Sequence, residues 1–270
     1  MKAWLNNRLI DEEEATVSIF DRSYLYGEGV FETLRVYESR PAFFSLHYKR
    51  LKKNCRRLGI PLPLSEKKLE TTVLRLLKAN HLKETVVRIT LSTTNISIFC
   101  RPIHIDPKLF QRGVKVLPLK SLCNDSPAVA GIKSTSYLTK MLARAEGDHA
   151  GAHDALLKNS RGHWVEGSRT NFFIIVKGVV ITPPQSDGLL KGITREVVLK
   201  ILKQKKIKHR EAHITDSLLK KADEIFLTGS TSEVLPVREI IGLWKKQIQK
   251  KTLTFQIRKY YLTLFQQQVK

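Results

Sequence analysis

Residues 121–138 read SLCNDSPAVAGIKSTSYL, and this stretch sets how the rest of the chain is organised. Its first part, residues 121–131, is polar and then rich in small residues and proline, which is typical of a segment between two domains. The sequence therefore predicts a small N-terminal α/β domain over residues 1–120, a linker over 121–131 and a larger domain over 132–270. Helical and strand-like segments occur on both sides of the linker, so the expected fold class is α+β.

Lys133 follows the linker in a setting unlike that of most other lysines of this chain. No charged residue lies within several positions of it in PAVAGIKSTSYL. Because desolvation penalises an ammonium group, a lysine in an apolar setting loses its charge readily. The neutral amine is the form that makes a Schiff base with an aldehyde. A lysine that extends along an apolar surface to reach water would show the same pattern, so this residue alone does not decide the chemistry.

Hydrophobic periodicity predicts helices and strands over most of the chain. Before the linker we expect a hairpin that turns at Asn6-Asn7, strands over VFETLRVY (30–37) and VVRITLS (86–92), a helix within residues 41–60 and a second helix that begins at Ser65. After it we expect a helix that ends at Gly151, a hairpin that turns at Lys177-Gly178, a helix over ITREVVLKILKQ (193–204), a buried strand over EIFLTG (224–229) and a helix over residues 254–265. Residues 92–113 show no clear period and are expected to form a loop.

Two segments are candidates for binding a phosphate. In LLKGITRE (189–196), Gly192 precedes Ile193 and Thr194 at the start of an amphipathic helix, where free backbone N–H groups and the helix dipole favour an anion. The turn TGSTSEV (228–234) follows a strand and offers the hydroxyls of Ser230 and Thr231. Taken alone, each segment is better explained as an ordinary helix start or turn than as a phosphate site.

Glu166 is a candidate partner for a buried positive charge. It lies in HWVEGSRTNFF (163–173), at the end of an apolar strand and before a Gly-Ser turn. A carboxylate at such a place is costly unless it meets a cation, and a protonated pyridine nitrogen would be one. A solvent-exposed glutamate at a strand end is the alternative.

Composition limits the class of protein. Hydrophobic residues make up 42% and charged residues 27%, as in globular proteins. The sequence lacks both a signal peptide pattern and a run of about 20 apolar residues, and its three cysteines are widely spaced, so we expect a cytoplasmic protein without a metal site or a membrane segment. The net charge of +22 favours anionic partners. Because the lysines occur in scattered patches, a solvated basic surface is favoured over nucleic-acid binding.

Together these segments resemble the fold-type IV enzymes that depend on pyridoxal phosphate (PLP), the class IV aminotransferase family. The resemblance rests on DRSYLYGEGVFETLRVY (21–37), HYKRL (47–51), GIKSTSYL (131–138), WVEGSRTNFF (164–173), TPP (182–184), LLKGITRE and ADEIFLTGSTSEVLPV (222–237), which occur in the family's order and cover nearly the whole chain. It implies a barrel-like larger domain, PLP as cofactor and a homodimer.

The resemblance also implies a role for individual residues. Lys133 matches the lysine that holds PLP as a Schiff base and moves the proton, and Glu166 matches the carboxylate that pairs with the pyridine nitrogen. The other implied cofactor contacts are Arg50, Ile193, Thr194, Ser230 and Thr231 at the phosphate and Leu190 on the ring face. Phe31 matches a position that lines the substrate pocket.

The chain departs from the family pattern in two places. A strand that often reads R-x-T-x-T-R-G is RITLSTT (88–94) here, so that Thr93 and Thr94 replace an Arg-Gly pair close to the substrate carboxylate. Arg101 and His104, in the segment that follows, are candidate replacements. A G-x-P-G-P segment that is usual near the C-terminus of the aminotransferases is also missing.

Family members differ in reaction. The short chain and the missing G-x-P-G-P segment favour 4-amino-4-deoxychorismate lyase, which forms pyruvate and 4-aminobenzoate for folate synthesis. The TGSTSEV turn favours the alternative, an aminotransferase that acts on branched-chain or D-amino acids. We expect the lyase, with a small anionic amino substrate. A basic nucleic-acid-binding protein on an inactive enzyme scaffold is a remote alternative.

Overall fold

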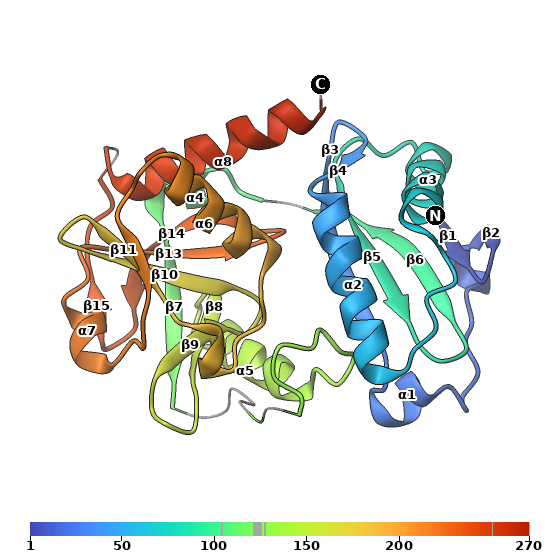
Figure 1. Ribbon diagram of the computed structural model, residues 1–270, viewed down its shortest axis with the longest axis horizontal. Helices are drawn as coiled ribbons and strands as arrows, with labels where there is room; N and C mark the ends of the chain where they lie inside the picture. The colour runs from blue at the N-terminus through green and yellow to red at the C-terminus, as the bar shows by residue number, and fades with distance from the viewer. Residues whose placement is uncertain (104, 121–125, 127, 250, 270) are drawn as a thin grey trace. The chain divides into compact units, whose positions relative to one another are not determined.

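The computed structural model describes residues 1–103, 105–120, 126, 128–249 and 251–269 (Figure 1). Contacts between residues divide the chain into two compact units. The first comprises Met1–His104, Ile132–Tyr137 and Gln268–Lys270, and the second comprises Ile105–Gly131 and Leu138–Gln267. These bounds differ from the predicted division at residues 120 and 131, because strand β7 (Val114–Leu119) hydrogen-bonds to strands of the second unit.

The first unit consists of an antiparallel sheet covered by two helices. The sheet has the order β2-β1-β6-β5-β3-β4. Its strands are β1 (Lys2–Leu5), β2 (Arg8–Asp11), β3 (Val30–Tyr37), β4 (Arg40–Pro41), β5 (Thr85–Leu91) and β6 (Ile96–Arg101), and its helices are the 3-10 helix η1 (Glu12–Glu14), α1 (Arg22–Tyr26), α2 (Phe44–Leu58) and α3 (Glu66–Ala79). Leu51 of α2 and Val73 of α3 belong to one core with Val87 and Ile98 of the sheet.

Most predicted elements of this unit are confirmed. β1 and β2 form the expected hairpin, and Asn6 and Asn7 both have positive φ, as its tight turn requires. The side chain of Ser65 accepts a hydrogen bond from Lys68 N at the start of α3. The loop predicted for residues 92–113 is wrong. It contains β6, which pairs with both β1 and β5 in the interior of the sheet, and helix α4 (Lys108–Arg112).

The second unit contains a nine-stranded sheet that is curled like half a barrel, as expected for the larger domain (Figure 1). The strand order is β12-β11-β10-β13-β14-β7-β8-β9, and β15 pairs with β14. Its elements after β7 are α5 (Leu138–His149), β8 (Asp154–Lys158), β9 (Trp164–Gly167), β10 (Asn171–Val176), β11 (Val179–Thr182), η2 (Gln185–Asp187), α6 (Ile193–Gln204), β12 (His209–Glu211), α7 (Asp216–Lys220), β13 (Glu224–Gly229), β14 (Glu233–Ile240), β15 (Trp244–Lys245) and α8 (Leu253–Val269). Phe172, Leu227 and Leu235 belong to its main core.

The lowered pKa of His153 predicts that the stability of the second unit depends on pH. Burial and the nearby guanidinium groups of Arg169 and Arg144 outweigh the carboxylates of Asp154 and Asp148 and lower its pKa to about 4. An unfolded histidine takes up a proton near its ordinary pKa of 6.5, so acidification between the two values favours unfolding. We expect the free energy of unfolding to fall as the pH drops from 6.5 to 4.

Urea titrations at a series of pH values measure this effect. The fall should be shallower in a His153→Asn variant than in the wild type, and a variant of the exposed His149 serves as the control. An equally steep fall in His153→Asn and wild type would contradict the assignment.

Among the helices of the described ranges, none combines the length and the apolarity that crossing a lipid bilayer requires.

Candidate active site

Lys133 is held at the start of strand β3 in the first unit. Its carbonyl oxygen accepts a hydrogen bond of 3.0 Å from Phe31 N, and the next residue, Ser134, forms a bridge with Val30. The Nζ atom lies 4.3 Å from the centroid of the Phe31 ring. The backbone contacts therefore fix where this amine is presented, and the face of a buried aromatic ring lies beside it.

Arg88, which the sequence analysis did not single out, lies on the same ring. It extends from β5, and its Cζ atom is 3.3 Å from the Phe31 centroid. Burial lowers the pKa of this guanidinium to about 10, and the charge of Arg101 contributes to that shift. The side chain of Tyr137 meets the ring edge-on at 5.5 Å. A signal was present, because Arg88 is the one charged residue in the apolar strand TVVRITL.

Arg50 belongs to a buried cluster of charges in the first unit. It donates to both carboxylate oxygens of Glu32, at 2.8 and 2.7 Å, and His47 Nδ1 lies 2.7 Å from the same carboxylate. Burial alone would raise the pKa of Glu32, but Arg50 and His47 hold it well below its ordinary range. Burial lowers the pKa of His47 against the opposing effect of Glu32, and the charges of Arg50 and Lys133 add to that shift. The motifs GVFET and HYKRL thus also contain Glu32 and His47, the partners of the candidate residue Arg50 in this cluster.

Glu166 accepts three hydrogen bonds in the second unit. It is 3% exposed on β9. Its donors are Lys140 Nζ of α5 at 2.7 Å, Leu190 N at 3.0 Å and Asn171 Nδ2 at 3.3 Å. The cation that a buried carboxylate requires is therefore present, and Lys140 and Asn171 are partners that the sequence did not reveal. Leu190 contributes its backbone here, and its side chain is half-buried.

The start of α6 leaves backbone N–H groups for a ligand. Gly192 is the N-terminal cap residue, and no side chain of the described part of the chain caps the helix there. A β-carbon at position 192 would overlap Asn171 Oδ1, so the close approach requires glycine. Thr194 is buried and its side chain hydrogen-bonds to Tyr261 of α8, whose pKa is raised by burial. Tyr261 is a further residue that the sequence analysis missed.

The turn between β13 and β14 carries Ser230 and Thr231, both half-buried. Just before it, Thr228 pairs across the sheet with Asn171, the residue that donates to Glu166. The hydroxyl oxygen of Thr228 is buried and has no hydrogen-bond partner among the described residues. A buried hydroxyl without a partner is unfavourable, so its position is consistent with a polar ligand.

The segment after β5, where Thr93 and Thr94 stand in place of the family's Arg-Gly pair, is stabilised by a buried carboxylate. Asp21 accepts hydrogen bonds from Ser92 Oγ at 2.6 Å, Thr94 Oγ1 at 2.8 Å and Asn95 Nδ2 at 2.5 Å. Thr94, one of the two residues that replace the Arg-Gly pair, therefore shapes this turn through its hydroxyl. Arg101 is exposed at the end of β6. His104 lies outside the described residues.

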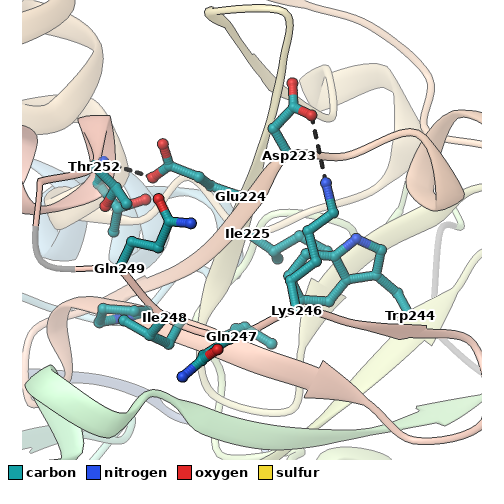
Figure 2. A pocket seen from close by; sticks show the side chains of 12 residues that line it. Asp223, Glu224, Ile225, Trp244, Lys246, Gln247, Ile248, Gln249 and Thr252 are labelled. Atoms are coloured by element: carbon teal, nitrogen blue, oxygen red, sulfur yellow. Dashed lines mark hydrogen bonds and ion pairs between the residues drawn. The ribbon is translucent and has the colours of Figure 1, made fainter.

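A pocket of about 250 Å³ in the second unit contains none of the predicted site residues (Figure 2). It is lined by residues of β13 and β14 and by the segment that leads into α8, and Lys246 pairs with Asp223 at its edge (Figure 2). The described residues of its walls include no lysine in an apolar setting that could react with an aldehyde. We therefore take the residues around Lys133 in the first unit, and separately those around Glu166 in the second, as the candidate site residues, and not the lining of this pocket.

The residues of each unit fit the groups of PLP. The first unit supplies an amine beside an aromatic ring, and it holds Arg50, whose guanidinium is bonded to the Glu32 carboxylate. The second supplies a buried carboxylate, an uncapped helix start and the partnerless hydroxyl of Thr228, within the part of the chain that the structure describes. A protonated pyridine nitrogen requires an acceptor such as a carboxylate, and a phosphate requires N–H and O–H donors.

Comparisons with known proteins agree with this chemistry. The model of the amino-transferase class IV family matches residues 29–240. A protein of Methanocaldococcus jannaschii, provisionally named a branched-chain-amino-acid aminotransferase, is 36% identical over 90% of this chain and 88% of its own. The D-alanine aminotransferase of Bacillus licheniformis is 28% identical over 90% of this chain and 89% of its own.

Solved structures show the same fold. The branched-chain aminotransferase of Thermoproteus uzoniensis, solved with norvaline, has a TM-score of 0.88 and 31% identity over 98% of this chain and 94% of its own. The T.th. branched-chain amino acid aminotransferase, solved with pyridoxamine 5'-phosphate, has a TM-score of 0.83 and 26% identity over 97% and 92%. A Legionella pneumophila protein, provisionally named 4-amino-4-deoxychorismate lyase, has a TM-score of 0.82 and 27% identity over 95% and 97%. The chain therefore belongs to the class IV aminotransferase family and is an enzyme that uses pyridoxal phosphate.

Proposed function

We propose that this enzyme is an aminotransferase that moves an amino group between a branched-chain amino acid and a 2-oxo acid. The observation that carries the proposal is the 36% identity to the Methanocaldococcus jannaschii relative. The sequence had favoured the lyase, partly because the chain is short. That reasoning fails, because this chain spans 88% of that aminotransferase, so length does not separate the two reactions.

The cofactor residues proposed from the resemblance keep their roles. Lys133 would hold PLP through its amine, and Glu166 would pair with the pyridine nitrogen. Arg50, Ile193, Thr194, Ser230 and Thr231 would bind the phosphate and Leu190 would pack on the ring. When bound, PLP supplies an electron sink for negative charge at the substrate α-carbon. The Lys140 contact and the two donors on the other oxygen keep Glu166 oriented for this pairing.

Lys133 would also move the proton of the reaction. Once the substrate amine has taken its place, the Nζ atom is free to act as general base on the substrate α-carbon and then as general acid. Its carbonyl contact with Phe31 N anchors the backbone while the side chain moves. The Phe31 ring beside the amine and the Tyr137 ring packed against it would offer apolar contacts to a branched side chain.

Arg88 is proposed to bind the substrate carboxylate, in place of the missing Arg-Gly pair. Its guanidinium is largely removed from water on the Phe31 ring, where a charge-assisted hydrogen bond is strong. We expect Arg88→Gln to raise KM for the amino acid about 10- to 100-fold, with a smaller effect on kcat, because such a bond contributes about 1.5–3 kcal/mol. Steady-state kinetics with leucine as donor measure this change.

The same substitution at the exposed Arg75 of α3 is the matched control and should leave KM unchanged. If KM of Arg88→Gln equals that of the wild type, another residue binds the carboxylate.

Substrate assays on the purified holoenzyme test the proposal. Glutamate should form from 2-oxoglutarate with L-leucine, L-isoleucine or L-valine as donor. Glutamate from D-alanine but not from these donors would reassign the enzyme to D-amino acids. Pyruvate released from aminodeoxychorismate without any 2-oxo acid would instead establish the lyase. The homodimer and the cytoplasmic location stay predictions.

A further inference from the structure

Three side chains of the second unit that have no role in the proposed cofactor binding converge at one place. His163 follows the turn after β8, Asp187 ends η2, and His213 follows β12. The ligand atoms of these side chains all lie within 4.8 Å of one another. His213 Nδ1 is 2.9 Å from both carboxylate oxygens of Asp187, and His163 Nδ1 is 3.4 Å from Oδ1.

Backbone contacts hold these segments together. Trp164 N donates to Ile214 O at 2.8 Å, and the two residues form an isolated bridge, which keeps the histidine-bearing segments side by side. Asp187 N donates to Pro184 O at 3.0 Å within its own turn. The backbone positions of all three side chains are therefore set without a ligand, which lowers the entropic cost of binding one.

The chemistry of the three groups matches a divalent transition metal. Two imidazole nitrogens and one carboxylate oxygen are the ligand types that zinc and cobalt prefer, with bonds of about 2.0–2.2 Å. The Asp187 carboxylate is fully buried, while the side chains of His163 and His213 are 22% and 50% exposed. The exposed rings can turn toward an ion, and the open side leaves a coordination position for water.

Two other groups contact Asp187. Arg161 Nη2 lies 3.0 Å from Oδ1 and also donates to Ser186 O, and its side chain is 52% exposed. Asn159 Nδ2 donates to the Asp187 carbonyl at 3.3 Å and lies 3.4 Å from Oδ1. The Arg161 guanidinium is paired with the Asp187 carboxylate and would compete with a metal ion for it. Since it is half in water, it can leave at little cost.

We propose that His163, Asp187 and His213 form a binding site for a zinc-like divalent metal ion, for which Arg161 is the resident competitor. The ion would join three loops of the second unit. One of them continues from Asp187 to Leu190, the residue whose N–H group donates to Glu166. Occupation of the site would therefore also hold that loop in place.

Binding of Co²⁺ to untagged holoenzyme tests the proposal, after treatment with EDTA and in a buffer without phosphate. We expect one equivalent to bind with visible d–d absorption, and Zn²⁺ to displace it. The double variant His163→Ala/His213→Ala should bind at least about tenfold more weakly. Removal of a histidine from the exposed end of α5, in His149→Ala, is the matched control and should not change binding.

Removal of Arg161 should change the affinity for Co²⁺ in the direction opposite to the removal of the histidines. Arg161→Ala should bind Co²⁺ more tightly than the wild type, because a positive charge has left the carboxylate. A cluster that is only an ion-pair network predicts no such gain. Absence of Co²⁺ binding by the wild type, equal binding by the double variant, or weaker binding by Arg161→Ala would each overturn the proposal, provided that circular dichroism shows folded variants.

Discussion

Lys133→Ala should lower kcat for transamination by at least about 10³-fold, because the substitution removes both the attachment of the cofactor and the proton-transferring amine. The side chain lies beside the Phe31 ring, and neither the Lys133 carbonyl contact with Phe31 N nor the bridge of Ser134 with Val30 depends on the amine. The variant should therefore fold. Borohydride reduction followed by mass spectrometry should find the cofactor attached to Lys133 in the wild type and no attachment in the variant.

Lys67→Ala, at an exposed lysine of α3, is the matched control and should keep wild-type turnover. Wild-type turnover by Lys133→Ala would remove the central assignment. Cofactor trapped on another lysine of the wild type would do the same.

Glu166→Gln should lower kcat by about 10²-fold or more, because a neutral amide cannot stabilise a protonated pyridine nitrogen as a carboxylate does. The substitution keeps the size of the side chain and an oxygen that can accept from Leu190 N. It also leaves Lys140 without the carboxylate at 2.7 Å, so we expect a lower melting temperature. Single-turnover kinetics with saturating PLP separate the loss of rate from any loss of cofactor affinity.

Lys140→Met separates the contribution of the Lys140 cation to turnover from that of the Glu166 carboxylate. It removes the cation but keeps the Glu166 carboxylate with its contacts to Asn171 and Leu190. We expect a smaller fall in kcat than for Glu166→Gln. An equal fall in both variants would show that the carboxylate acts only through Lys140.

Most of the predicted site residues were found from patterns among residues that are neighbours in the sequence. Lys133 differs from other lysines by its uncharged neighbours, and Gly192 and Thr194 mark a helix start. The structure places Lys133 in an irregular segment beside β3, and Gly192 and Thr194 at the start of α6. Such features can be predicted from the sequence because helix caps, glycine turns and apolar runs depend on nearby residues.

The strand β6 shows where local reasoning failed. Its alternating residues Ile96, Ile98 and Cys100 are buried, yet the stretch was predicted as a loop. The pattern is short and is followed by Pro102 and a helix, so periodicity over a longer window is lost. Pairing with β1 and β5, which lie outside this local stretch, is what makes it a strand.

The chain alone was sufficient for the two-unit α+β plan, the family and its cofactor, because those follow from motifs whose order and spacing are written in neighbouring residues. Only the folded molecule decided which groups meet: Lys140 with Glu166, Arg88 with Phe31, and Tyr261 with Thr194. Each of these pairs joins separate elements, and whether a charge or hydroxyl finds its partner depends on packing between segments that local sequence does not encode.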